Sequence, residues 1–332
     1  MPDLLRVVRA TPKHLSRTGK LNSFTYLMLN LPFICNYRCT KCFNLTQNNP
    51  HGEKNLITIN ERIGLIEEAK RLGAKAVVIA GEGEPSIHPE FDKLIEKISS
   101  DGMTPIFYSN GSCIDSKRIK FLKKHGVVII FSFDTLDEEK YDKLSGTKGN
   151  LKKVVANIQN AIKEYAELTV EEKGMKVYNL AVNTTVSHLN ENEVEKIKSF
   201  FGKGIYFVCN PIVRLGNAEG NWGEFEPSDD SILRQKKLIQ KLSDTGGPLT
   251  LGADGFCGYS RWGIGISPSG EYMTCAYTTA TNKFLGNIRT KTLKEAFEFK
   301  HKIEGRHYAK FGVAPCLVRM TSFAKYVEEL KK

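Results

Sequence analysis

The 332-residue sequence has no apolar run long enough to cross a membrane. Its longest apolar runs, such as 127–131, are much shorter than the roughly 20 residues that a bilayer requires. The first 20 residues mix basic side chains with scattered apolar ones, which is not the pattern of a signal peptide. Internal repeats and low-complexity segments are absent as well. We therefore predict a cytoplasmic protein that has no membrane partner.

Negative charge is scarce relative to positive charge. The chain has 48 Lys and Arg against 37 Asp and Glu, a formal net charge of +11. Such an excess favours acidic partners, including nucleic acid. Many of the lysines, however, fall in helical patterns such as 117–124 and 236–241, where they are expected on solvated faces. No basic run is interleaved with the aromatic residues that single-strand binders use for stacking, so nucleic acid is not the expected partner.

Short β-rich segments alternate with longer helical segments through the first two thirds of the chain. Apolar residues recur every three to four positions in the helical segments, and six strand segments precede them: 24–31, 75–80, 104–109, 127–133, 176–186 and 205–213. Because parallel strands need long return connections, this alternation predicts an α/β fold with a parallel sheet. An open doubly wound sheet and a curved partial barrel both fit. In either fold the chemistry is expected at the carboxyl ends of the strands.

The alternation ends near residue 221. A helical segment at 229–242 is followed by the helix-breaking sequence TGGP, and 262–277 has the pattern of two short strands joined at an SPSG turn. Another helix is expected around 293–297. We therefore divide the chain into an N-terminal extension at 1–20, an α/β domain at 21–220 and a small C-terminal domain of β-hairpin plus helix at 221–332.

Three of the eight cysteines lie within eight positions, in the sequence CNYRCTKC at 35–42. In a reducing compartment, clustered thiols are more often metal ligands or catalytic groups than disulfides. A structural zinc site needs four ligands, a set that Cys35, Cys39, Cys42 and His51 would complete. A 4Fe–4S cluster bound by three thiolates instead leaves one iron open, which is useful only where a cofactor or substrate binds. The residues alone leave both kinds of site open.

The C-x3-C-x2-C spacing directly after the first strand of a βα series resembles the radical S-adenosylmethionine (SAM) enzymes. The resemblance implies a partial (β/α)6 barrel of the TIM type, with Cys35, Cys39 and Cys42 as ligands of a 4Fe–4S cluster. It also implies that SAM binds the open iron and that an electron donor such as flavodoxin or ferredoxin reduces the cluster. Cleavage of SAM then releases a 5′-deoxyadenosyl radical, which abstracts a hydrogen atom from the substrate.

Further segments resemble the SAM-binding motifs of that family. The sequence AGEGEP ends the second strand, and three of its residues resemble the GGEP motif: Gly83, Glu84 and Pro85. Glu82 replaces the first glycine of that motif. Lys41 stands where the family often has an aromatic residue before the last cysteine, so Phe43 is the expected neighbour of the adenine. The resemblance implies four more SAM contacts near the ends of later strands: Asn110, Ser132, Asp134 and Asn183.

The C-terminal cysteines resemble the ligands of a twitch domain, a shortened relative of the SPASM extension that carries an auxiliary iron–sulfur cluster. They are Cys257, Cys275 and Cys316, and Arg319 stands where the usual fourth ligand would lie. Three alternatives follow: an open iron binds substrate, another residue completes the cluster, or these are ordinary buried cysteines. The resemblance therefore implies a second, auxiliary 4Fe–4S cluster without fixing its fourth ligand.

The reaction type depends on Cys209, which ends the sixth strand at a rim position expected to face the substrate. A thiol there can return a hydrogen atom to a substrate radical, which would make the protein an epimerase. Alternatively, the auxiliary cluster accepts a second electron, and the protein is a dehydrogenase or a peptide-modifying oxidoreductase. The expected substrate is a peptide or a small polyhydroxylated metabolite. Two other functions stay open: an RNA-modifying radical SAM enzyme and a non-catalytic zinc or iron–sulfur binding module.

Overall fold

The computed structural model describes residues 24–44, 55–172, 175–202, 204–242, 263–274 and 285–311. Some predicted features lie outside these ranges: the N-terminal extension, His51, Arg319, and the cysteines Cys257, Cys275 and Cys316. Within the ranges, no helix combines the length and the apolar character that a membrane crossing requires.

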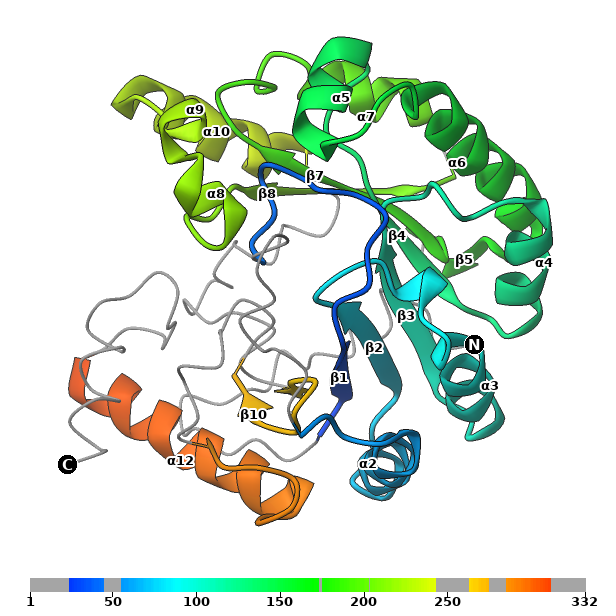
Figure 1. Cartoon of the computed structure of the whole chain (residues 1–332), viewed down its shortest axis with the longest axis vertical. Coiled ribbons are helices and arrows are strands. Elements are labelled where there is room, and N and C mark those ends of the chain that lie inside the picture. The colour runs from blue at the N-terminus through cyan, green and yellow to red at the C-terminus, as the bar shows by residue number, and fades with distance from the viewer. Residues whose placement is uncertain are drawn as a thin grey trace.

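Six parallel strands form most of the main sheet, with helices on its outer side (Figure 1). In spatial order they are β1 (Tyr26–Leu31), β2 (Ala76–Gly81), β3 (Thr104–Ser109), β4 (Val128–Ser132), β7 (Leu180–Val186) and β8 (Tyr206–Pro211). The sheet curves but does not close among the described strands, because β8 lies at one edge. The predicted α/β class and partial (β/α)6 barrel are therefore confirmed.

Helices follow the strands, and most of them cover the outer face of the sheet (Figure 1). They are α2 (Ile59–Arg71), α3 (Phe91–Ser100), α4 (Ser116–Lys124), α5 (Glu138–Ser145), α6 (Leu151–Tyr165), α7 (Val194–Phe201), α8 (Asn217–Gly220), α9 (Trp222–Phe225) and α10 (Asp229–Leu242). Two short 3-10 helices are η1 (Pro85–Ile87) and η2 (Ala166–Leu168). The predicted fifth strand is shorter than expected, because its first residues belong to β6 (Met175–Val177), which pairs with β5 (Val170–Glu172) in a separate hairpin.

Side-chain caps fix where several of these helices begin. At the start of α2, the Thr58 hydroxyl accepts from the Glu61 N–H at 3.2 Å, and the Glu61 carboxylate accepts from the Thr58 N–H at 2.7 Å. This reciprocal capping box satisfies two N–H groups that have no partner inside the helix. Asp115 and Asp137 cap α4 and α5 with their carboxylates. The caps set the points at which the chain leaves the carboxyl edge of the sheet.

The alternation of side chains along each strand divides the sheet between two cores. The larger core lies between the sheet and the helices and contains Phe91, Phe107 and Phe131. The smaller core fills the barrel interior with Met28, Ile106 and other apolar side chains. Near the carboxyl ends of the strands, polar residues occupy the positions that face the barrel interior: Asn30, Asn183 and Asn210. The barrel interior therefore changes from apolar to polar toward the edge where a site is expected.

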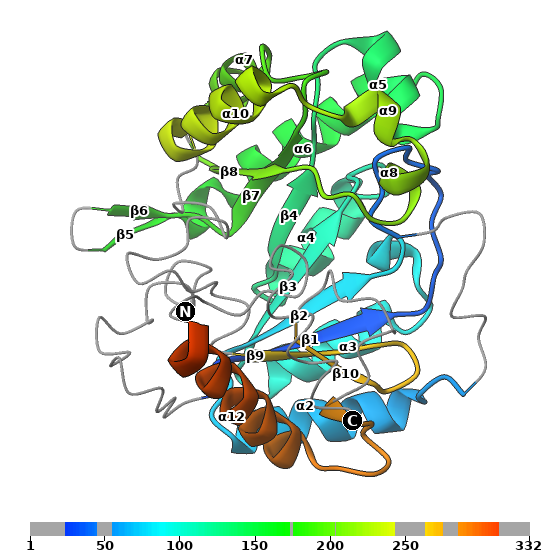
Figure 2. The same ribbon diagram turned by 90° about the vertical axis from the view of Figure 1, so that its left-hand side faces the viewer.

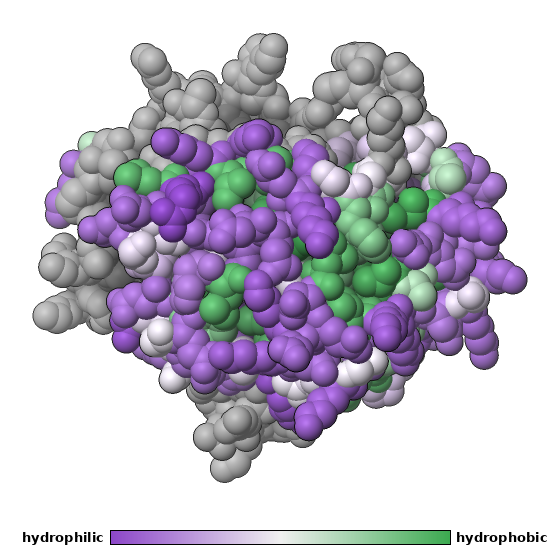
Figure 3. All heavy atoms as spheres, turned by 90° about the horizontal axis from the view of Figure 1, so that it is seen from above, coloured by the Kyte–Doolittle hydropathy of each residue, from purple (hydrophilic) through white to green (hydrophobic). Residues whose placement is uncertain are grey.

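The outer faces of the helices are largely polar. In α4, the side chains of Lys117, Lys120 and Lys124 are exposed, whereas Ile119 and Leu122 are buried. The face shown in Figure 3 is mostly hydrophilic where its residues are described, with smaller hydrophobic areas between. The predicted placement of the α4 lysines on a solvated helix face is therefore confirmed.

The expected C-terminal hairpin joins the main sheet. Its strands, β9 (Gly263–Ile266) and β10 (Tyr272–Met273), are antiparallel and meet at the predicted turn. β9 also pairs in parallel with β1, so the hairpin extends the barrel sheet instead of forming a sheet of its own (Figure 2). Gly263 permits this pairing, because a Cβ atom there would lie 2.4 Å from the carbonyl oxygen of Tyr26.

The expected C-terminal helix, α12 (Leu293–Phe311), lies beside α2 (Figure 2). Its Phe297 ring packs edge-on against Phe24, which precedes β1, with 4.8 Å between the ring centroids. The hairpin and this helix thus both contact the N-terminal part of the barrel. The domain boundary at residue 221 stays a prediction.

The larger core supplies a test of the fold. Phe107→Ala removes a fully buried ring whose centroid lies 4.9 Å from that of Phe91. We expect a loss of about 3–5 kcal/mol in the free energy of unfolding, measured by urea titration, because the cavity cannot fill completely. Phe200→Ala is the control, since the Phe200 side chain is 44% exposed and should cost less than about 1 kcal/mol. Equal losses in the two variants would contradict this description of the core.

Candidate active site

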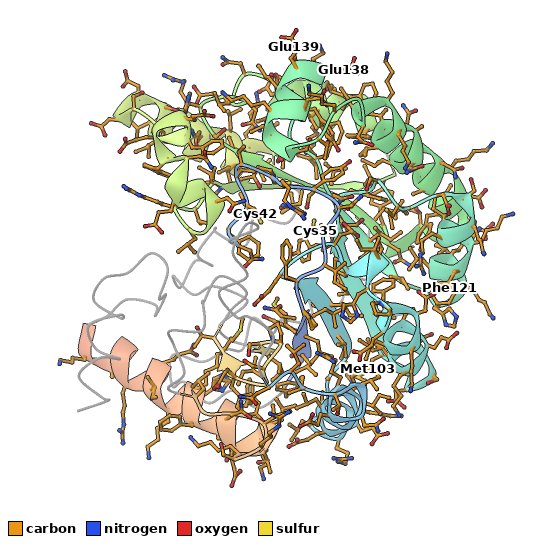
Figure 4. All side chains as sticks on the ribbon, viewed as in Figure 1. Cys35, Cys42, Met103, Phe121, Glu138 and Glu139 are labelled. Carbon is orange, nitrogen blue, oxygen red and sulfur yellow. The ribbon has the colours of Figure 1, made fainter. Side chains whose placement is uncertain are left out.

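The predicted cysteine motif lies on the loop 32–44, which leaves the carboxyl end of β1. Figure 4 shows Cys35 and Cys42 on this loop within the curve of the sheet, whereas Glu138 on α5 points outward. Cys35, Cys39 and Cys42 are all half-buried and line one pocket of about 220 Å³. The structure therefore brings the three predicted ligands together.

Three glycines from other segments contact the backbone of this loop: Gly83, Gly146 and Gly216. Cβ atoms at these positions would lie 2.1 Å from the Ile34 oxygen, 2.2 Å from the Arg38 oxygen and 2.4 Å from the Phe43 oxygen, respectively. Gly146 and Gly216 also have φ angles of 64° and 59°, in the left-handed region that favours glycine. A larger residue at any of the three would displace the cysteine loop.

Hydrogen bonds hold the loop on both sides. The N–H groups of Arg38 and Thr40 donate to carbonyl oxygens at the end of α5, at 3.1 and 3.0 Å. On the other side, the Asn217 side chain donates to the Cys39 carbonyl oxygen at 2.9 Å. The loop is therefore clamped between α5 and α8. The contribution of α8 to the site was not predicted. The sequence feature that could have indicated it is the pair Gly216–Asn217, in which Gly216 precedes α8 and Asn217 is its first residue.

Burial raises the pKa of all three thiols, to about 11 for Cys35 and about 12 for Cys39, with Cys42 shifted in the same direction. Thiolates at these positions therefore need nearby positive charge, which the irons of a cluster supply. Backbone N–H groups already donate to two sulfurs, from Tyr37 to Cys35 and from Asn44 to Cys42, both at 3.4 Å. This donor set fits a 4Fe–4S cluster.

The same thiols do not form a chelate for one ion. In the described part of the chain, no three His, Cys, Asp or Glu side chains converge as ligands of a single metal. A cluster has no such requirement, because each of its thiolates binds a different iron. The alternative zinc site also requires His51, which lies outside the described residues. The arrangement of Cys35, Cys39 and Cys42 around one pocket favours the cluster.

Glu84 connects the ends of β2 and β3 at the pocket. Its carboxylate accepts hydrogen bonds from the Ser86 and Ser109 hydroxyls at 2.5 and 2.9 Å, and from the Asn110 N–H at 2.7 Å. Burial raises the pKa of Glu84, and these donors oppose the rise. The side chain also lines the pocket, so this motif residue is held in one orientation at the site.

The predicted SAM contacts divide into two groups. Six of them line the pocket: Gly83, Glu84, Asn110, Ser132, Asn183 and Phe43. Pro85 does not, because it begins η1 and is buried there. Asp134 does not either, because its carboxylate forms an ion pair with Lys41 and accepts from the Thr185 N–H at 2.6 Å. The expected contact of Asp134 with SAM stays a prediction, and its carboxylate would make that contact in addition to these two protein partners.

Cys209 does not face the pocket, which contradicts its predicted role. It is fully buried in the core between the sheet and the helices. Its neighbours Val208 and Asn210 face the barrel interior instead, because successive side chains of a strand point to opposite faces. A hydrogen-atom donor has to contact the substrate, so the structure does not support epimerisation through Cys209.

Several polar residues of the pocket were not predicted as site residues, among them Glu82, Tyr108, Thr185 and Asn210. Burial raises the pKa of Glu82 to about 7. Asn210 is 9% exposed and donates from Nδ2 to Asn183 Oδ1 at 2.6 Å, while its own Oδ1 accepts no hydrogen bond from the described residues. Strand parity is the signal that identifies Tyr108 and Asn210, since both continue an inward-facing series.

These features define a barrel with a candidate metal-cluster site at the carboxyl ends of its strands, and sequence comparison identifies the family. A family model described as the Radical SAM superfamily matches residues 29–201, which is more than half of the chain. The chain therefore belongs to the radical SAM superfamily. This membership implies a 4Fe–4S cluster and SAM as cofactors, in agreement with the donor set of the cysteine loop.

Curated relatives are similar over part of their length. A probable GTP 3′,8-cyclase of Methanococcus maripaludis is 30% identical over 156 residues, which cover 47% of this chain and 49% of the relative. A GTP 3′,8-cyclase of Mannheimia succiniciproducens is 22% identical over 233 residues, covering 68% and 65%, respectively. The chain thus spans between about half and two thirds of the length of these relatives.

Solved structures share the fold at low sequence identity. SuiB of Streptococcus suis bound to S-adenosylmethionine has a TM-score of 0.62 and 14% identity, over 83% of this chain and 66% of SuiB. The structure of anSMEcpe with bound AdoMet has a TM-score of 0.57 and 16% identity, over 92% of both chains. At these identities the likeness shows the common architecture alone.

The contact of Gly146 with the cysteine loop can be tested by substitution. In Gly146→Ala, the new methyl group would clash with the Arg38 carbonyl oxygen and displace the loop. We expect the iron and acid-labile sulfide content after anaerobic reconstitution to fall well below that of the native chain. Gly149→Ala is the matched control, because its φ is 68° but no atom lies within 4 Å of the position that its new methyl group would take. The two variants share a backbone cost of about 1–2 kcal/mol, so equal cluster contents would contradict the loop contact.

Proposed function

We propose that Cys35, Cys39 and Cys42 bind the SAM-cleaving cluster of this radical SAM enzyme, and that the adjoining pocket binds SAM and substrate. The reduced cluster with bound SAM supplies the hydrogen-abstracting 5′-deoxyadenosyl radical of this superfamily. The observation that carries the proposal is that the three thiols and six predicted SAM contacts line one pocket. A flavodoxin or ferredoxin is the proposed electron donor.

Pocket residues from neighbouring strands are proposed to bind different parts of SAM. Gly83 and Glu84, after β2, are proposed to hold the methionyl amine, with Asn110 beside them after β3. Ser132 at the end of β4 and Asn183 on β7 lie further along the sheet, next to each other in register. They are proposed to contact the nucleoside. The Phe43 ring, from the loop that carries the cysteines, is proposed to cover the adenine.

The substrate is proposed to offer N–H or O–H donors, as a peptide or a small polyhydroxylated molecule does. Glu82, directly after β2, and Asn210, on β8, line the pocket from opposite parts of the sheet. The buried Asn210 Oδ1 accepts no hydrogen bond from the described residues, and such an atom is costly unless a ligand or water donates to it. Lys41 is the only cationic side chain in the described lining, and it forms an ion pair with Asp134.

The reaction is proposed to be a net two-electron oxidation. The substrate C–H bond would give a hydrogen atom to the deoxyadenosyl radical, and the resulting substrate radical would lose one electron to an acceptor and one proton to water. The proposed electron acceptor is an auxiliary cluster held by Cys257, Cys275 and Cys316, which rests on the resemblance of those cysteines to a twitch domain. The burial of Cys209 away from the pocket favours oxidation over epimerisation, because no thiol donor is supplied from that position.

The relatives favour a second candidate, a cyclisation of GTP. The two curated relatives described above are named as a probable GTP 3′,8-cyclase and a GTP 3′,8-cyclase. A triphosphate carries several negative charges and is usually bound by more than one Arg or Lys side chain. The described lining offers one lysine, already paired with an aspartate. GTP would therefore need cationic side chains from outside the described lining, and for this reason it stands second.

Two further alternatives have less support. Membership of an enzyme superfamily disfavours a non-catalytic zinc or iron–sulfur binding module. An RNA substrate is supported by the net charge of +11 alone.

The cysteine assignment predicts which thiols are needed to cleave SAM. With dithionite and SAM under anoxic conditions, Cys35→Ala should lose 5′-deoxyadenosine formation, because two thiolates cannot hold the cluster with one open iron. Cys113→Ala is the matched control, since Cys113 is also half-buried but lies outside the motif. Chromatographic assay of 5′-deoxyadenosine measures both. Undiminished formation by Cys35→Ala would exclude Cys35 as a ligand.

The substrate class predicts the origin of the abstracted hydrogen. Three uniformly deuterated probes are offered separately with SAM and dithionite: a peptide mixture, a mixture of small sugars, and GTP. We expect mass spectrometry to find deuterium in 5′-deoxyadenosine with the peptides or the sugars, because both present donors to the pocket. Deuterium from GTP would establish the second candidate, and none from peptides or sugars would refute the first.

Asn210→Ala refines this measurement. It removes the buried acceptor and also the hydrogen bond that Asn210 donates to Asn183, so deuterium transfer should fall by a larger factor than SAM cleavage without substrate. Asn160→Ala is the control, because the Asn160 amide forms an exposed hydrogen bond to Ser116 on the helical side. Equal transfer by the two variants would mean that Asn210 does not contact the substrate.

A further inference from the structure

Lys41 is a charged residue inside the cysteine motif, between Cys39 and Cys42. Its side chain is 16% exposed and lines the same pocket as the three thiols. The family often has an aromatic residue at this position, so the charge is a feature of this chain. A largely buried ammonium beside three thiols requires a partner to stay there.

Asp134 is that partner, and it is fixed independently of Lys41. Its carboxylate is 8% exposed and accepts a hydrogen bond from the Thr185 N–H at 2.6 Å. Its backbone carbonyl oxygen accepts from the Asn190 side chain at 2.9 Å. The ammonium of Lys41 also lies 3.4 Å from the Thr185 hydroxyl oxygen. The positive charge is therefore held in one place by groups from β7 and from the segment after β4.

We propose that Lys41 is a fixed positive charge that raises the reduction potential of the cluster bound by Cys35, Cys39 and Cys42, and that Asp134 positions it. Reduction adds one negative charge to the cluster. A nearby buried cation stabilises that charge more than it stabilises the oxidised form, because charge interactions are weakly screened away from water. Net charge and hydrogen bonding around a cluster are recognised determinants of its potential.

The two members of the ion pair are expected to shift the reduction potential of the cluster in opposite directions, and the effect of Lys41 is expected to be the larger. Lys41 belongs to the cysteine loop and lines the pocket of the three thiols, whereas Asp134 does not line that pocket. The lysine is therefore expected to have the larger effect on the charge of the cluster. Arg38, also on the cysteine loop, is exposed, so water screens its charge more effectively.

Because Lys41 and Asp134 carry opposite charges, their removal should shift the reduction potential in opposite directions. Lys41→Met removes the cation at similar length, and the equilibrium constant for one-electron reduction should fall about tenfold, equal to 59 mV. Asp134→Asn removes the opposing charge, and the potential should rise. Lys41→Arg keeps the charge and should stay close to the native value. Lys143→Met is the control, because Lys143 pairs with Glu224 on the surface and is 56% exposed.

The measurement is a redox titration of the reconstituted holoprotein, followed by electron paramagnetic resonance in the absence of SAM. The relevant signal is the one that changes when SAM is added, and iron and sulfide contents confirm equal loading. An unchanged potential in Lys41→Met, or shifts of the same sign in Lys41→Met and Asp134→Asn, would overturn the proposal. If Lys41→Met does not retain the cluster, an unchanged or lower potential in Asp134→Asn overturns it. No substrate is needed, so the result is independent of the proposed reaction.

Discussion

Close backbone contact around the cysteine loop is the constraint on which the candidate site depends. Residues 32–44 of this loop form no helix or strand, so their shape comes from their neighbours. Gly83, Gly146 and Gly216 contact it from three segments that are far apart in the sequence. The strands and helices of the barrel thus fix the positions of the sulfur atoms before any cofactor is bound. Binding then costs less conformational entropy than it would for a free loop.

The barrel interior is apolar at its base and polar at its carboxyl edge, and this separation suits the proposed radical chemistry. Apolar side chains fill its base, where Met28, Ile106 and their neighbours exclude water and polar groups. The polar side chains that line the pocket gather at the carboxyl edge, beside the thiols. A reactive radical formed there meets a limited set of groups, most of which are held by hydrogen bonds, as Glu84 and Asn210 are. Orientation of the substrate then decides which hydrogen atom is lost.

Much of the barrel was predictable because parallel strands covered on both faces are continuous apolar runs. The convergence of Cys35, Cys39 and Cys42 was also predictable, since they share one short loop. Contacts between distant segments were not. Whether the Cys209 side chain faces the pocket or the helices depends on its position along β8, because a shift of one residue moves a side chain to the other face of the sheet. The pairing of Lys41 with Asp134 joins separate loops and was not predicted. The sequence identified Lys41 only as the replacement of an aromatic residue, and Asp134 only as a SAM contact.

The parallel pairing of β9 with β1 has a consequence for the integrity of the barrel. A partial barrel leaves strands with unpaired N–H and C=O groups at its margins, and such margins can recruit strands from other molecules. Here the chain protects the β1 margin with its own C-terminal hairpin, which ends in the two-residue β10. A chain shortened before residue 263 would leave β1 uncovered and prone to self-association. The C-terminal hairpin therefore protects the β1 edge from aggregation, and the C-terminal segment is also the proposed location of the auxiliary cluster.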